Sequence, residues 1–136
     1  MKFDGLRKSD NKWALSPFAR GRRVERALGT NLPCDFPVID RFRDGIATSI
    51  KSLDIRSRAY RNAAVLAKTV KTYIESAAGF NGLLWEGAAV RPGDIKGRAL
   101  ELAIPCPGSG EQAACLQNMV VYGKTIGVNV TLLVKS

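Results

Sequence analysis

Asp35 to Asp54 reads DFPVIDRFRDGIATSIKSLD, and this stretch decides the expected fold. It holds two runs rich in β-branched and aromatic residues on either side of Asp44-Gly45, a pair typical of a tight hairpin turn. We expect a strand over residues 36–42 and a return strand over residues 46–53. Pro37 favours the start of a strand or an edge position, because proline has no backbone N–H to donate.

This hairpin would bring three polar side chains together. Side chains alternate between the two faces of a strand, so Ser49 and Lys51 share a face of the return strand. Pairing across the Asp-Gly turn then places Asp40 beside Ser49. A carboxylate, a hydroxyl and an ammonium group are therefore expected as neighbours. The plain alternative is that Ser49 and Lys51 belong to an exposed polar face.

The segment before the hairpin predicts a short helix over residues 17–28. Ser16-Pro17 is typical of an N-cap followed by proline at the first helical position, and Gly29 is typical of a helix end. Residues 1–15 are polar without a clear period and indicate a linker or arm, with Trp13 and Leu15 as its anchors. One domain is expected over residues 16–136.

One face of this helix combines apolar residues with a carboxylate. The residues that share the face are Phe18, Gly21, Glu25 and Leu28. Burial of a carboxylate is costly unless a cation or a metal ion lies against it. Glu25 is therefore a candidate metal ligand, and the alternative is that it pairs with a neighbouring arginine.

The remaining chain predicts two more helices and two more strands. A basic connector leads to a helix over residues 62–78, and a glycine-rich loop over residues 80–97 holds at most a short strand. A strand over residues 98–104, a helix over residues 110–126 and a strand over residues 128–134 follow. This order predicts an α/β fold with a single mixed β-sheet flanked by helices, ending in a right-handed parallel crossover.

The charge is strongly basic and unevenly distributed. The 21 Lys and Arg against 12 Asp and Glu give a formal net charge of +9. Residues 1–75 hold 16 basic and 8 acidic side chains, whereas residues 76–136 hold 5 and 4. This asymmetry indicates a surface for a polyanion such as nucleic acid. Candidate contacts are Arg20, Arg22, Arg23, Arg56, Arg58, Arg61, Lys68 and Lys71. A membrane surface is the weaker competitor, since no basic stretch is strongly amphipathic.

Several classes of function are excluded by what the sequence lacks. It contains no histidine, which removes histidine-dependent catalysis and imidazole metal sites. Cys34, Cys106 and Cys115 lack C-x-x-C spacing, so neither a disulfide framework nor a thiolate zinc site is indicated. There is no apolar run near 18 residues and no secretion signal. The chain is expected either to work in a cytosol or to be a piece of a longer protein.

The remaining chemistry fits phosphodiester hydrolysis. This reaction needs a metal ion, acidic ligands to hold the ion, and a cation near the developing charge. Glu25 and Asp40 could supply the carboxylates, Ser49 a weaker oxygen ligand, and Lys51 the cation. Oxygen ligands suit Mg²⁺ or Mn²⁺, with Zn²⁺ as the third candidate.

Four segments, ALGTNLPCDFPVIDRF, DGIATSIKSLD, DIKGRALELAIP and YGKTIGVNVTLLV, resemble the C-terminal tRNase toxin domains of CdiA, the exported effector of contact-dependent growth inhibition. The resemblance covers about residues 20–136 and implies the core of PD-(D/E)XK metal-dependent nucleases. It implies that Glu25 is the acidic residue of the first core helix, Asp40 the motif aspartate and Lys51 the motif lysine. Ser49 stands where many members have an acidic residue, which favours one metal ion over two.

The resemblance also implies a biological setting. The domain would be exported as the C-terminal part of a large surface effector and would act in the cytoplasm of a target bacterium. A specific immunity protein would neutralise it in the producing cell, and the domain would otherwise be a monomer. We expect first a metal-dependent endonuclease that cuts tRNA. The alternatives are a DNase with the same core and site, and a basic nucleic-acid-binding module without catalysis.

Overall fold

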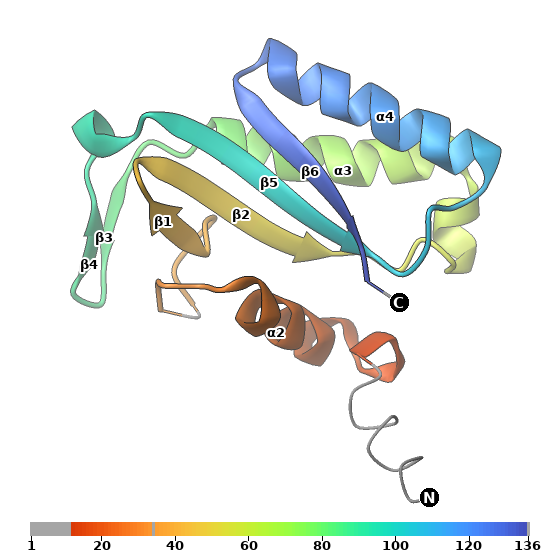
Figure 1. Ribbon diagram of the computed structural model, residues 1–136, viewed down its shortest axis with the longest axis horizontal. Helices are drawn as coiled ribbons and strands as arrows, with labels where there is room; N and C mark the ends of the chain where they lie inside the picture. Colours follow the sequence, from red (N-terminus) through yellow and green to blue (C-terminus); the bar gives the residue numbers. More distant parts are fainter. Residues whose placement is uncertain (1–11, 34, 136) are drawn as a thin grey trace, which may run out of the picture.

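The structure is a computed structural model that describes residues 12–33 and 35–135. Its centre is a four-stranded sheet in the order β1-β2-β5-β6 (Figure 1). The strands are β1 (Arg41–Arg43), β2 (Ile46–Ser52), β5 (Gly97–Ile104) and β6 (Val128–Val134). β1 is antiparallel to β2, while the other two pairings are parallel. The predicted α/β fold with one mixed sheet is confirmed.

The hairpin turn forms at the predicted residues. Asp44 and Gly45 both have positive φ angles, 55° and 82°. Two such residues in sequence form the turn whose twist matches an antiparallel strand pair, and Asp-Gly is a preferred pair for it. The register joins Arg41 to Thr48 and Arg43 to Ile46.

Two long helices cover one face of the sheet. α3 (Ala63–Ala78) begins at Asn62, whose side chain accepts from the N–H groups of the first turn. α4 (Gly110–Thr125) begins with a capping box between Ser109 and Gln112. The two helices lie side by side (Figure 1) and bury the largest hydrophobic cluster against β5 and β6. Their bounds agree with the predicted helices.

A third helix, α2 (Pro17–Leu28), packs against β2 on the other side of the sheet. Ser16 caps its start, and Gly29 ends it with a φ of 86°. Val24 of this helix packs against Ile50 and Ala103 in a small separate cluster. Because side chains alternate along a strand, this cluster lies on the opposite face from the α3 and α4 core.

The predicted apolar face of α2 was wrong in part. Its buried residues are Arg20 and Val24, whereas Phe18 is 75% exposed. The spacing of apolar residues was misleading because only one narrow side of the helix faces the sheet, and Arg20 occupies that side together with Val24.

The first strand is shorter than predicted. The sequence indicated residues 36–42, but the chain becomes extended only at Arg41. Val38 has a φ of 72°, and the N–H of Ile39 donates to the carbonyl of Pro37 at 2.9 Å. This local turn prevents a longer strand.

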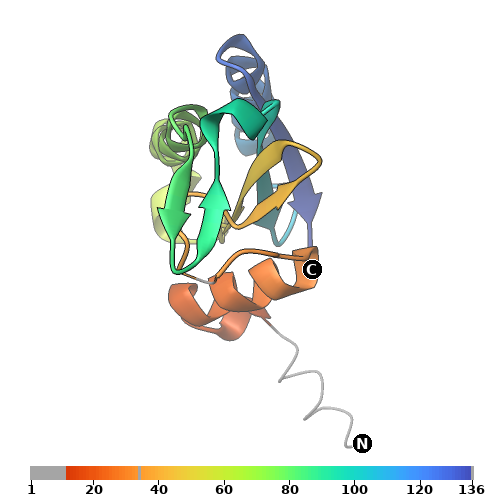
Figure 2. The same ribbon diagram turned by 90° about the vertical axis from the view of Figure 1, so that its left-hand side faces the viewer.

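The glycine-rich segment holds two short strands, where at most one was predicted. β3 (Leu83–Trp85) and β4 (Ala88–Val90) form a separate hairpin (Figure 2). Its turn again has two positive φ angles, 47° at Glu86 and 82° at Gly87. Three short 3-10 helices complete the described elements: Lys12–Ala14, Arg58–Arg61 and Pro92–Asp94.

Part of the predicted arm is packed. Trp13 is 8% exposed, and its indole N–H donates to the carbonyl of Lys135. Residues 1–11 and Cys34 lie outside the described residues. Cys106 is partly buried and Cys115 is buried, and both are free thiols. No helix among residues 12–33 and 35–135 is long and apolar enough to cross a membrane.

Candidate active site

Asp40 lies directly before β1. At this point β2 becomes the edge strand of the sheet, because β1 pairs only with residues 46–48 of β2. The backbone N–H of Asp40 donates to the carbonyl of Thr48 at 2.9 Å. Its Oδ2 atom accepts from the backbone N–H of Ile50 at 2.7 Å. Because β1 begins only at Arg41, it cannot pair with the second half of β2, and the Asp40 carboxylate takes the place of a neighbouring strand.

Glu25 comes to the same place from α2. Burial raises its pKa to about 7, and the negative charge of Asp40 contributes further to the increase. The charges of Lys51 and Arg22 act in the opposite direction but do not compensate. Arg22 is one of the charges that act on Glu25, so the alternative of a neighbouring arginine partner stays a prediction beside that of a metal ligand.

The pKa of Asp40 is also raised, chiefly by burial. The hydrogen bond from Ile50 and the charges of Lys51 and Arg41 oppose this increase. Two neighbouring carboxyl groups thus resist full ionisation in one partly buried site. Such a pair gains from a cation placed between or beside its members.

Lys51 completes the cluster from β2. Its ammonium nitrogen acts electrostatically on both carboxyl groups. The same nitrogen lies 5.5 Å from the centre of the Tyr73 ring on α3, a cation–π contact. Sequence reasoning placed Lys51 near Asp40 but did not single out Tyr73, whose signal was only that of an apolar helix position.

Ser49 is 2% exposed and lies between the two residues of β2 that Asp40 contacts, Thr48 and Ile50. The register of the hairpin therefore brings Asp40 beside the part of β2 that carries Ser49 and Lys51, as the sequence predicted. The roles of Glu25, Asp40, Ser49 and Lys51 in metal binding or catalysis remain predictions.

Two residues that sequence reasoning missed hold Asp40 in place. Arg41 donates to the carbonyl of Leu28 at 2.9 Å and forms a salt bridge with Glu101 on β5. Asn31 pairs with the backbone of Phe42 through both its amide oxygen and its amide nitrogen, at 2.9 and 2.8 Å. These contacts join the end of α2, the start of β1 and the sheet. They link residues far apart in the sequence, so local sequence patterns do not predict them.

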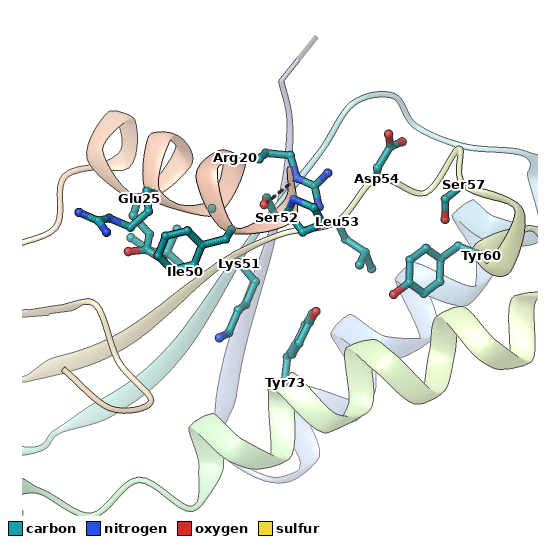
Figure 3. A pocket seen from close by; sticks show the side chains of 14 residues that line it. Arg20, Glu25, Ile50, Lys51, Ser52, Leu53, Asp54, Ser57, Tyr60 and Tyr73 are labelled. Carbon is teal, nitrogen blue, oxygen red and sulfur yellow. Dashed lines mark hydrogen bonds between the residues drawn. The ribbon is translucent and has the colours of Figure 1, made fainter. Parts of the chain in front are cut away.

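A pocket of about 540 Å³ opens beside the cluster, between α2, the end of β2 and α3 (Figure 3). Glu25 and Lys51 are among its lining residues, as are Arg20, Asp54, Tyr60 and Tyr73. Asp40 and Ser49 are not among the lining residues. The pocket therefore gives solvent access to two members of the cluster.

The predicted nucleic-acid contacts differ in their surroundings. Arg20 is only 8% exposed, its Nε donates to Ser52 at 3.2 Å, and its guanidinium lies 5.2 Å from the Trp13 ring centre. Arg56 is engaged by Asp54 through two hydrogen bonds of 2.9 and 3.0 Å. The exposed members of the set are Arg22, Arg56, Arg58, Arg61, Lys68 and Lys71. Their contact with nucleic acid stays a prediction.

The cluster fits a hard divalent cation through its donor set. Two carboxyl groups with raised pKa values supply negative charge, and Ser49 lies on β2 between the two residues that Asp40 contacts. Within residues 12–33 and 35–135, no group of three or more Asp, Glu, Cys or His side chains gathers as a metal site. An ion held here would need further oxygen ligands from the backbone, water or substrate, as Mg²⁺ commonly does.

Comparisons with known proteins agree with this architecture. Deoxyribonuclease CdiA-o11 of Escherichia coli O157:H7 (strain EC869) is 30% identical over 131 aligned residues, and the match covers 89% of this chain and 34% of that protein. Deoxyribonuclease CdiA of Yersinia pseudotuberculosis serotype O:3 (strain YPIII) is 30% identical over 108 residues, 77% of this chain and 10% of that protein. The chain thus spans about a third and a tenth of these relatives.

A solved structure has the same fold. It is the CdiA-CT/CdiI toxin and immunity complex from Yersinia pseudotuberculosis, with a TM-score of 0.74 and 27% identity over 83% of this chain and 98% of that one. The family described as CDI toxin restriction endonuclease-like domain matches residues 20–133. The predicted CdiA toxin resemblance is confirmed at this level: the chain belongs to the family of CDI toxin restriction endonuclease-like domains.

Proposed function

We propose that this domain is a metal-dependent DNA endonuclease toxin of contact-dependent growth inhibition. The observation that carries the proposal is the meeting of Glu25, Asp40 and Lys51 beside β2, at the point where β1 begins. The site opens to solvent through the pocket. Membership of a nuclease toxin family supports hydrolysis of phosphodiesters as its reaction.

DNA replaces tRNA as the favoured substrate. The sequence placed tRNA first, but both curated relatives are named deoxyribonucleases. Nothing in the geometry of the cluster favours RNA. The DNase alternative is therefore the better-supported proposal, and tRNA becomes a comparison substrate.

Each residue of the cluster has a distinct proposed role. A divalent ion would be held by Glu25 and Asp40, with Ser49 as a weaker ligand, and would activate water and stabilise charge on the phosphate. Lys51 would place its ammonium group against the negative charge that develops during cleavage. Tyr73 and the Ile50 N–H fix the positions of Lys51 and Asp40.

The proposal includes an immunity partner and delivery by a larger effector. The related solved structure is a toxin and immunity complex, and the curated relatives are CdiA proteins much longer than this chain. A domain with a net charge of +9 suits an inhibitor of opposite charge. Action in the cytoplasm of a target bacterium follows from the same proposal.

The test incubates the purified domain with plasmid DNA and, separately, with total tRNA, each with Mg²⁺, Mn²⁺ or Zn²⁺. We expect plasmid nicking that EDTA stops and tRNA that stays intact. Asp40→Asn and Lys51→Ala should each abolish nicking. Cleavage of tRNA alone would overturn the choice of DNA, and unimpaired nicking by both variants would overturn the site.

Two substitutions serve as matched controls. Asp94→Asn removes an exposed carboxylate, and Lys124→Ala removes an exposed ammonium group on α4. Both residues lie outside the pocket and the cluster, so both variants should nick plasmid at the rate of the unaltered domain. Circular dichroism spectra of all four variants would show that each is folded.

A further inference from the structure

The pocket beside the cluster extends well past Glu25 and Lys51, and its farther part has a chemistry of its own. Tyr60 and Tyr73 line it, and both phenolic oxygens point into the space (Figure 3). Among the described residues, neither hydroxyl has a hydrogen-bond partner, nor does that of Ser57 in the same wall. Burial raises the pKa of Tyr73, nearby Tyr60 adds to the increase, and the charge of Arg20 opposes it.

The mouth of the pocket carries an exposed aromatic ring. Phe18 lines the pocket and is 75% exposed, which is unusual for a large apolar side chain on a helix that packs against a sheet. The Arg22 guanidinium lies 5.7 Å from the centre of this ring. An aromatic face next to a cation at a pocket entrance suits a flat, partly apolar group attached to a phosphate.

The size of the pocket selects among the parts of a nucleic acid. About 540 Å³ lies within the range of roughly 300–1,000 Å³ usual for small-molecule sites. That space holds one nucleotide but no segment of duplex. Phe18, Tyr60 and Tyr73 offer rings, and the hydroxyl groups and Arg20 offer hydrogen bonds, which is the combination that recognises an unstacked base.

We propose that this pocket receives one unpaired nucleotide of DNA, adjacent to the phosphodiester bond that is cut. The inference rests on the proposed nuclease function and adds the class of substrate. Glu25 and Lys51 line the same pocket, so a base inside it is joined through its own backbone to a phosphate at the cluster. The preferred substrate is DNA with a local unpaired nucleotide.

The walls favour a base over a second phosphate as the occupant. Asp54 is part of the lining, and its pKa is lowered, chiefly by the hydrogen bond from Arg56. An ionised carboxylate in the wall repels a phosphate, even when an arginine partly neutralises it. The same carboxylate accepts hydrogen bonds from the amino groups of bases.

The first experiment compares two end-labelled DNA duplexes of the same sequence, one fully matched and one with a single-nucleotide bulge. We expect kcat/KM to be about tenfold or more higher for the bulged duplex, because a matched duplex must first unstack a nucleotide. The cuts should fall at the phosphates next to the bulge. Equal rates on both duplexes, or cuts unrelated to the bulge, would overturn the inference while leaving the nuclease proposal intact.

Variants of the pocket walls test the residues. Tyr60→Leu and Tyr73→Leu should lower the ratio of the two kcat/KM values, whereas Tyr73→Phe keeps the ring and should retain most of the ratio. Tyr122→Leu is the matched control, because Tyr122 lies on α4 and makes a similar contact with Lys71 at 5.3 Å. An unchanged ratio in both pocket variants would contradict the assignment.

A binding measurement separates this inference from the nuclease proposal. The Asp40→Asn variant is mixed with bulged DNA that carries 2-aminopurine as the unpaired base. Stacking against an aromatic ring quenches this base, so we expect a loss of fluorescence on binding that the additional change Tyr60→Leu reduces. Quenching without any cleavage by the unaltered domain would defeat the nuclease proposal alone, and binding without quenching would defeat the pocket alone.

Discussion

The Asp40 carboxylate accepts a hydrogen bond from the backbone N–H of Ile50 at 2.7 Å, and so a side chain completes the edge of a strand. Asp40 therefore has two roles that substitutions can separate: its side chain accepts a structural hydrogen bond, and its negative charge belongs to the proposed metal site. Asp40→Ala leaves the Ile50 N–H without its acceptor, which should lower the free energy of unfolding by about 1–3 kcal/mol. Asp40→Asn keeps an acceptor oxygen and removes a charge whose burial is unfavourable.

We therefore expect both variants to lose DNA cleavage and only Asp40→Ala to lose stability. Urea denaturation at pH 7.5 in EDTA, followed by circular dichroism, measures the difference between the two. Equal destabilisation by both substitutions would show that the negative charge, and not the hydrogen bond, supports the edge of β2.

The raised pKa of Glu25 predicts a pH dependence of stability. The pKa of this carboxyl group is near its ordinary value of 4.5 in the unfolded chain and about 7 in the folded protein. Between these values the folded protein binds more protons, so the free energy of unfolding falls as the pH rises from about 4.5 to about 7 and then levels. Thermal melts in EDTA across this range measure the slope.

Glu25→Gln supplies the control for that slope. Glutamine cannot ionise, so this variant should be more stable than the unaltered domain at pH 8 and should show a shallower decline. The pKa of Asp40 is also raised, chiefly by burial, so Asp40 contributes a decline of the same sign. A variant with the same slope as the unaltered domain would show that Glu25 is not the titrating group.

How far the sequence predicts this site depends on the range of each contact. The spacing of Asp40, Ser49 and Lys51 follows from the two-residue period of a strand and from one Asp-Gly turn, both local properties. The turn at Val38 shortened the first strand without disturbing this register, because the register is counted from the hairpin turn and not from the start of the strand.

The structure brings Glu25 close to Asp40, and helical periodicity alone does not explain why. The helical pattern put it on a face with Phe18, which is in fact 75% exposed. What buries Glu25 is the approach of α2 to β2 and Asp40, a tertiary contact that helical periodicity does not contain. The salt bridge between Arg41 and Glu101 joins residues 60 positions apart and is likewise invisible to local patterns.

Ser49 is the residue that departs from the acidic pattern implied by the family resemblance. Ser49→Ala removes the only hydroxyl proposed as a ligand and should weaken metal binding without unfolding the domain. Isothermal titration calorimetry with Mn²⁺ should show a higher Kd, and the metal concentration for half-maximal cleavage should rise with it. Ser76→Ala on the exposed side of α3 is the control. Unchanged Mn²⁺ affinity in Ser49→Ala would remove Ser49 from the ligand set.

The Arg41–Glu101 salt bridge should support the site through the backbone. Its side chains are 15% and 22% exposed, so it is better shielded than a surface ion pair. A double-mutant cycle with Arg41→Ala and Glu101→Ala should give a coupling energy of about 0.5–3 kcal/mol in urea denaturation. Additive effects of the two substitutions would show that the pair contributes no interaction of its own.

Arg20 and Arg22 lie two residues apart on α2, but Arg20 is buried and Arg22 is exposed, so we expect different effects when each is replaced. Arg20 is buried against Trp13 and Ser52, so Arg20→Ala should lower the free energy of unfolding by about 1–3 kcal/mol. Arg22 is exposed, and Arg22→Ala should change stability by less than about 0.5 kcal/mol. If Arg22 contacts a phosphate, its loss should reduce the slope of log affinity against log salt by about 1.

Fluorescence anisotropy with labelled DNA at several salt concentrations measures that slope, and denaturation in urea measures the stability of both variants. The comparison is informative because the two substitutions remove the same charge from the same helix. A large loss of stability in Arg22→Ala with none in Arg20→Ala would contradict the packing described for α2. An unchanged salt slope in Arg22→Ala would exclude Arg22 from the DNA-binding surface, because each neutralised phosphate adds its own share of released counterions.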